Sequence, residues 1–130
     1  MKEKNQIESK FLDSSIWLEY LINEKFGDII KSEKIIYVSQ LSLFEIKRVL
    51  LRRKYPLSEV NLALEFVKKR SIIINLSNQI VDLASEISIK NKLSALDALI
   101  YTTSLLNNSI FLTLDNDFRN LQDSLILKTK

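Results

Sequence analysis

Residues 10–21, KFLDSSIWLEYL, begin as a short apolar strand and continue as a helix, with Asp13 at the junction. The rest of the chain repeats this alternation of short apolar or β-branched runs with longer segments of helical period. Such alternation is typical of an α/β fold whose strands are largely parallel. We therefore predict an α/β fold with a central, mainly parallel sheet of four to five strands.

The local patterns also predict the individual elements. Strands are expected at residues 10–13, 35–39, 72–76 and 110–114, with a weaker fifth at 125–128. Helices are expected at residues 15–23, 27–31, 41–53, 58–69, 78–90 and 95–108. The predicted N-caps are Ser58, Ser77 and Ser94, and Pro56 separates two helices. The length of 130 residues fits one domain, so we expect residues 1–130 to form a single domain.

The amino-acid composition excludes several kinds of enzyme. The chain has no histidine and no cysteine, which excludes thiol nucleophiles, imidazole acid–base catalysis and the usual zinc ligands. Its one glycine, Gly27, excludes a glycine-rich phosphate loop. Any catalysis must therefore use carboxylates, which commonly hold hard divalent cations such as magnesium or manganese.

Four carboxylates interrupt or end strongly apolar stretches: Asp13, Glu45, Asp97 and Asp115. Asp13 ends the first predicted strand, and Asp115 ends the fourth in the run IFLTLD. Ligands of open parallel sheets bind outside the carboxyl ends of the strands, so these two acids predict a site at that edge. Asp117 lies two residues further on and is either another ligand or the cap of a short helix.

Each of these acids also has a purely structural interpretation. Asp13 precedes a helix and can cap it, while Asp97 stands three residues after Ser94 at the acidic position of a capping box. Glu45 and Arg48 lie three residues apart on a helix and can form a solvated ion pair worth a few tenths of a kcal/mol. Spacing alone leaves both interpretations open.

The positive charge of the chain is unevenly distributed. The net charge is only +3, but residues 47–54, KRVLLRRK, contain five cations, and residues 68–70 form a second cluster. One interpretation is that these residues bind a phosphate backbone. The other is that they are solvated cations near the C-terminal ends of helices, where they complement the helix dipole.

Several features favour a soluble protein of the cytoplasm. The absence of cysteine is compatible with a reducing compartment. Residues 1–10 contain no apolar signal core. No apolar run approaches the ~18 residues that span a bilayer. We therefore predict a cytoplasmic protein with no membrane segment.

Four segments together resemble the successive signatures of a PIN domain, a family of metal-dependent ribonucleases. They are FLDSSIWLEYL at 11–21, SLFEIKRVL at 42–50, LSALDALIYTTSLL at 93–106 and IFLTLDNDF at 110–118. The acids follow the family's order, Asp, Glu, Asp, Asp, and the resemblance covers nearly the whole chain. The compact length resembles the VapC-type toxins of toxin–antitoxin pairs.

This resemblance implies a three-layer α/β/α sandwich and a magnesium- or manganese-dependent endoribonuclease. It implies that the catalytic and metal-binding acids are Asp13, Glu45, Asp97 and Asp115, with Asp117 as an alternative or additional metal ligand. Ser14 and Thr113 match small polar positions that support the site. It also implies a homodimer and a VapB-type antitoxin whose C-terminal tail blocks the acidic site.

The cations after Glu45 suggest where RNA binds. We expect Arg48, Arg52, Arg53 and Lys54 to bring the RNA backbone to the acids. The competing hypothesis is a non-catalytic nucleic-acid-binding or regulatory domain whose acids serve only as caps and surface charges. A phosphoacceptor module is disfavoured because the third predicted strand ends in Asn75-Leu76-Ser77, without an acceptor aspartate.

Overall fold

The computed structural model describes residues 9–129 and has one five-stranded sheet. The strands are β1 (Lys10–Leu12), β2 (Ile36–Ser39), β3 (Ile72–Ile74), β4 (Ile110–Thr113) and β5 (Ser124–Ile126). They lie in the order β3-β2-β1-β4-β5, and every neighbouring pair is parallel. The predicted parallel sheet of four to five strands is thus confirmed. Because the order of the strands reverses at β1, the crevice between the ends of β1 and β4 is where a ligand is expected.

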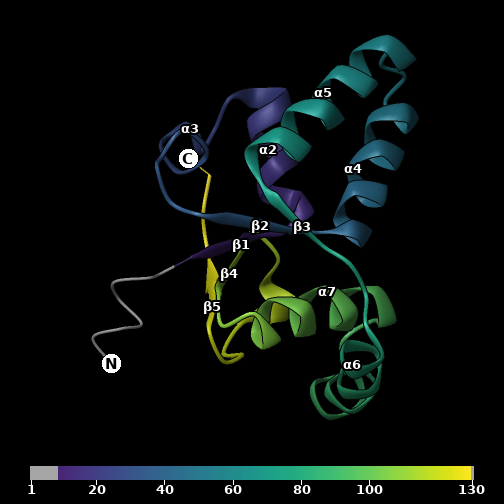
Figure 1. Ribbon diagram of the computed structural model, residues 1–130, viewed down its shortest axis with the longest axis vertical. Helices are drawn as coiled ribbons and strands as arrows, with labels where there is room; N and C mark the ends of the chain where they lie inside the picture. The colour runs from purple at the N-terminus through teal and green to yellow at the C-terminus, as the bar shows by residue number, and fades with distance from the viewer. Residues whose placement is uncertain (1–8, 130) are drawn as a thin grey trace.

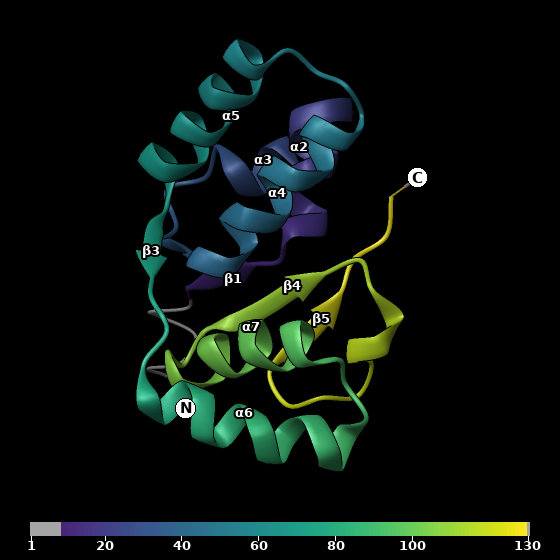
Figure 2. The same ribbon diagram turned by 90° about the vertical axis from the view of Figure 1, so that its right-hand side faces the viewer.

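Helices cover both faces of the sheet, so the expected three-layer sandwich is also confirmed (Figures 1 and 2). One face carries α2 (Ser14–Asn23), α3 (Gly27–Ile30), α4 (Gln40–Arg52) and α5 (Leu57–Arg70). The other carries α6 (Asn78–Asn91) and α7 (Ala95–Leu106). None of the helices within residues 9–129 is long and apolar enough to cross a membrane. The absence of a signal core was predicted for residues 1–10, of which 1–8 lie outside the described part.

Each face of the sheet has its own buried core. Successive strand residues point to opposite faces. Leu12 and Leu112 accordingly pack with α2, α4 and α5, whereas Phe11 and Phe111 pack with α6 and α7. The paired register of β1 and β4 sets Phe11 beside Phe111, with ring centroids 6.1 Å apart. A register shift of one residue would exchange the two cores, so the position of the acids after these strands is strongly specified.

Every predicted helix and strand has boundaries within two residues of those in the structure, and two of the three predicted N-caps are confirmed. Ser77 and Ser94 are N-caps as predicted, since their hydroxyls accept hydrogen bonds from the amides of Ile80 and Asp97. The prediction that Ser58 is an N-cap is wrong. Pro56 takes the N-cap position in an extended conformation (φ −60°, ψ 143°), and the helix already begins at Leu57. The fixed φ of proline thus sets the entry to α5.

Candidate active site

Asp13 lies immediately after β1 and is buried, with 8% of its surface exposed. Its Oδ1 accepts a hydrogen bond from the Ser14 amide at 2.7 Å. Its Oδ2 accepts from the hydroxyls of Thr113 at 2.6 Å and Ser15 at 3.1 Å. Asp13 therefore caps α2 and also lies at the carboxyl edge of the sheet, beside the end of β4.

Burial is the main influence on the ionisation of Asp13. It raises the pKa of the carboxyl above its usual value, and the negative charge of Asp115 raises it further. The hydrogen bonds from Thr113, Ser14 and Ser15 act in the opposite direction, because they stabilise the ionised form. The carboxylate is thus costly to bury but well supported by donors.

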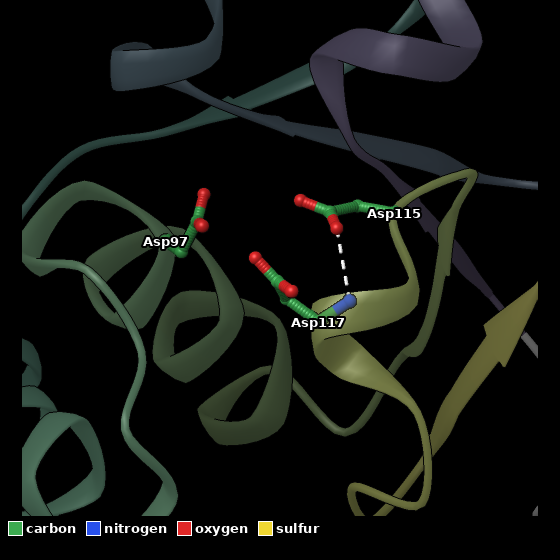
Figure 3. Close-up of side chains that lie close together, drawn as sticks. All are labelled: Asp97, Asp115 and Asp117. Carbon is green, nitrogen blue, oxygen red and sulfur yellow. Dashed lines mark hydrogen bonds between the residues drawn. The ribbon is translucent and has the colours of Figure 1, made fainter.

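Three further carboxylates converge beside α7 (Figure 3). Asp97 lies in the first turn of α7, and Asp115 and Asp117 lie in the segment that follows β4. One carboxylate oxygen from each of them can be chosen so that the three lie within 4.8 Å of one another. We call Asp97, Asp115 and Asp117 the acidic triad.

The segment after β4 holds two members of the triad in place. The Asp115 amide donates to the Thr113 hydroxyl at 3.0 Å, and the Asp117 amide donates to Asp115 Oδ1 at 2.9 Å. A short 3-10 helix, η1 (Asn116–Phe118), begins at this point and is capped by Asp115. The cap of this helix is therefore Asp115, so of the two roles considered for Asp117 the capping role is wrong.

Asp97 is half-buried, and the neighbouring acids affect its pKa. Burial is the largest cause that raises its pKa, and the charges of Asp13, Asp115 and Asp117 raise it further. The hydrogen bond with Ser94 opposes this rise. Asp97 thus has the predicted capping position, three residues after the N-cap Ser94, and also lies beside the other acids, because the first turn of α7 lies at the edge of the sheet where β1 and β4 end.

Glu45 lies on α4 and approaches the site from the opposite face of the sheet. The Ser14 hydroxyl donates to Glu45 Oε1 at 2.9 Å, whereas the hydroxyl of the next residue, Ser15, donates to Asp13, so adjacent residues of α2 contact two different acids. Burial raises the pKa of Glu45, as do the charges of Asp13 and Asp97, whereas Ser14 and the nearby charge of Arg48 lower it. Glu45 is therefore part of the same electrostatic cluster, although it is not a member of the acidic triad.

The donor atoms suit magnesium or manganese. The triad offers only carboxylate oxygens, the hard ligands that these cations prefer, and the mutual repulsion of the acids decreases when a cation binds. The residues present thus fit the metal that the resemblance implies. Of the predicted acids, Asp97, Asp115 and Asp117 form one group, and Asp13 and Glu45 stand beside it.

The predicted RNA-binding cations are all exposed, but they differ in their distance from the acids. Arg48 lies close enough to influence the pKa of Glu45. Arg52 ends α4, and Arg53 and Lys54 follow it. At about 1.5 Å of rise per residue, Arg52 is about 10 Å further along the helix than Glu45. Arg48 and Arg52 lie four residues apart on one face of α4, and Arg53 and Lys54 follow its end, so the four cations form a strip that leads away from the acids.

The structure also reveals Ser15, which was not predicted as part of the site. Its hydroxyl donates to Asp13 Oδ2 and accepts from the Leu114 amide at 3.1 Å, a contact between residues 99 positions apart in the sequence. The pair of serines that follows Asp13 was the feature of the sequence that could have indicated this role. Their separate partners depend on the neighbouring strand and helix.

A comparison with known families now identifies the chain. The PIN domain family model matches residues 10–123, which is most of the 130 residues. The chain belongs to the PIN domain family. Among proteins of curated function, none matches it.

Three solved structures with similar folds are distant from this chain in sequence. A toxin–antitoxin complex from Klebsiella pneumoniae superposes with a TM-score of 0.75 at 18% identity, covering 90% of this PIN domain and 96% of that chain. The Sarcin-Ricin loop cleaving toxin VapC20 of Mycobacterium tuberculosis gives 0.68 at 17% identity, covering 85% and 92%. VapBC2 from Rickettsia felis, bound to a DNA fragment from its promoter, gives 0.72 at 16% identity, covering 91% and 96%. At these identities the likeness concerns the fold.

Proposed function

We propose that this PIN domain is a metal-dependent endoribonuclease and the toxin of a type II toxin–antitoxin pair. The observation that carries the proposal is the acidic triad, whose carboxylate oxygens converge within 4.8 Å. Family membership and the likeness of the fold to VapC toxins support it. Helix capping alone does not require carboxylates from α7 and from the segment after β4 to lie close together.

The acidic triad would hold magnesium or manganese, with Asp13 and Glu45 beside it as further ligands or charges. When bound, such a cation polarises a phosphate and lowers the pKa of a water molecule. Asp13, Glu45 and Asp97 have raised pKa values, so protons compete with the cation for these carboxylates. Ser14 and Thr113 support the site by holding Glu45 and Asp13.

RNA would approach along the strip of cations on α4. Arg48, Arg52, Arg53 and Lys54 are exposed and available to neutralise backbone phosphates. Contacts of this kind carry little sequence information, so the choice of target must depend on other features of the protein or the RNA.

The proposed partners follow from the same assignment. We propose a VapB-type antitoxin whose C-terminal tail blocks the acidic site, a homodimer, and action in the cytoplasm. The similar structures include a toxin–antitoxin complex and a VapBC complex. Large apolar side chains are exposed on α4, with Phe44 61% and Leu51 42% accessible, which is consistent with a protein partner or a second copy.

Cleavage of a mixed pool of structured and unstructured RNAs tests the function. We expect the wild type to cleave RNA with magnesium or manganese and not with chelator, and we expect Asp13→Asn and Asp97→Asn to lose at least about 100-fold in rate, as is typical when a charge-stabilising group of an active site is removed. Asp82→Asn is the matched control, because Asp82 is an exposed acid of α6.

Each of the three possible results is informative. Activity lost in the two site variants and retained in Asp82→Asn would establish the acidic site as catalytic. Equal activity in all four proteins would indicate a contaminating nuclease, and no activity with either metal would favour the non-catalytic nucleic-acid-binding or regulatory domain.

A further inference from the structure

Two hydroxyls from opposite sides of the crevice contact the same atom of Asp13. Ser15 lies in the first turn of α2, and Thr113 is the last residue of β4. Both donate to Asp13 Oδ2, at 3.1 Å and 2.6 Å. Each hydroxyl also accepts a hydrogen bond from a backbone amide of the segment after β4. Ser15 accepts from Leu114, and Thr113 accepts from Asp115.

The direction of each of these hydrogen bonds is determined by chemistry. A backbone amide can only donate, so each hydroxyl oxygen must be the acceptor from Leu114 or Asp115. A hydroxyl has a single hydrogen, which each of these residues donates to Asp13. Ser15 and Thr113 therefore connect the carboxylate of Asp13 to the backbone that positions Asp115.

The two carboxylate oxygens of Asp13 differ in how many hydrogen-bond acceptor positions remain free. A carboxylate oxygen has about two lone pairs that can accept. Those of Oδ2 are used by Ser15 and Thr113, whereas within residues 9–129 Oδ1 accepts a hydrogen bond only from the Ser14 amide. Oδ1 thus keeps one acceptor position, and it is the only atom of Asp13 that can bind a cation without first losing a hydroxyl.

We propose that Ser15 is a positioning residue of the metal site. Together with Thr113 it occupies Oδ2 of Asp13, which leaves Oδ1 as the oxygen that would hold the cation, and through Leu114 it positions the segment that carries Asp115 and Asp117. This inference rests on the proposed function, since it assumes that the acids bind a divalent cation. Ser14 has a different role, because its hydroxyl contacts Glu45.

Binding of manganese alone, measured by isothermal titration calorimetry, tests this role without any RNA. Partners that orient metal ligands typically contribute about 10- to 100-fold to metal affinity. We therefore expect Ser15→Ala to weaken manganese binding by about that factor and Ser15→Thr, which keeps the hydroxyl, to restore most of the affinity. The control is Ser85→Ala, which removes an exposed hydroxyl bonded to its own helix and should bind manganese like the wild type.

A second pair of variants separates positioning from stability. Ser15→Val and Ser15→Thr have the same shape and differ in the hydroxyl, so they test the inference even where Ser15→Ala does not fold. Melting temperatures are measured in chelator to record the purely structural effect of each variant. A lowered melting temperature with unchanged manganese affinity in Ser15→Ala or Ser15→Val would show that Ser15 only stabilises the fold, and the inference would be wrong.

The same titrations separate this inference from the proposed function. If the wild type binds manganese and the variants without the hydroxyl bind it equally well, only the role of Ser15 is rejected. If the wild type binds no manganese, the metal-dependent function and the role of Ser15 are rejected together.

Discussion

At the scale of single residues, the site combines buried negative charges with a limited number of donors. Asp13 is the most buried of its acids, and three donors within its own neighbourhood compensate for the loss of water. Asp97 and Glu45 are half-buried, and the negative charge of Asp13 raises the pKa of each. The metal-free site is therefore an electrostatic cost to the folded protein.

The raised pKa values of these acids predict how the stability of the protein depends on pH. The pKa values of Asp13, Glu45 and Asp97 are raised in the folded state, so the folded protein binds protons more tightly than the unfolded chain. Their contribution to the free energy of unfolding therefore increases as pH falls from about 7 towards about 5, before the unfolded carboxyls are protonated. In chelator, we expect the melting temperature to rise over this range, and to rise less in Asp97→Asn.

Manganese should reverse this trend, because protons and metal compete for the same carboxylates. Differential scanning calorimetry at several pH values, with chelator and with manganese, measures both effects. A melting temperature in chelator that falls as the pH is lowered from about 7, equally in wild type and Asp97→Asn, would contradict the predicted influence of these acids.

At the scale of helices and strands, the ends of the elements position the acids. Asp13 follows β1, Asp97 lies in the first turn of α7, and Asp115 follows β4. This part of the site could be predicted from sequence, because apolar runs locate the strands and serine caps locate the helix starts. The role of Ser15 could not be predicted, because its bond to Leu114 exists only once β1 and β4 are paired. Ser58 was predicted wrongly because the pattern of a serine before a helix ignored the stronger constraint of Pro56.

The scarcity of glycine has a consequence at the helix ends. Lys92 ends α6 in the left-handed conformation, with φ 56° and ψ 43°, where glycine is normally favoured. We expect Lys92→Gly to raise the free energy of unfolding by about 0.5–1 kcal/mol, since the steric strain at this position is removed. Urea denaturation measures the change.

Lys90→Gly is the matched control for this prediction. Lys90 is an exposed lysine within α6, where glycine should lower the free energy of unfolding by about 0.5–1 kcal/mol. If both glycine variants were destabilised to the same degree, the strain assigned to Lys92 would be refuted.

At the scale of the whole molecule, the strand order brings together acids that are far apart in the chain. Asp13 and Asp115 become neighbours because β1 and β4 pair at the centre of the sheet, while α4 and α7 bring Glu45 and Asp97 from opposite faces. The site therefore exists only in the folded protein, and a cation that binds it must stabilise the fold. The strand pattern predicted that Asp13 and Asp115 meet, and the family resemblance implied that Glu45 and Asp97 join them. The exposed apolar surfaces were not predicted, because whether a large side chain is covered depends on how the helices pack.

The cation strip on α4 predicts a dependence of RNA binding on salt. Arg48 and Arg52 are exposed, and each phosphate contact that they make releases a counterion on binding. We expect Arg48→Gln with Arg52→Gln to weaken RNA binding in Asp97→Asn protein and to reduce the slope of log affinity against log salt by about 1–2. Fluorescence anisotropy at several salt concentrations measures the slope, with Lys68→Gln and Lys69→Gln on α5 as the control pair.

The central claim is that the acidic site activates water to cleave RNA, and the chemistry of the product ends tests it most directly. The RNA made by wild-type protein with magnesium or manganese is analysed by ligation and by enzymes specific for each kind of end, with Asp97→Asn as the control for background cleavage. Since water attacks the phosphate and the 2′-hydroxyl is not needed, we predict 5′-phosphate and 3′-hydroxyl ends that the Asp97→Asn protein does not make. Wild-type products with 2′,3′-cyclic phosphates and 5′-hydroxyls would show that the RNA supplies its own nucleophile, and would contradict the account.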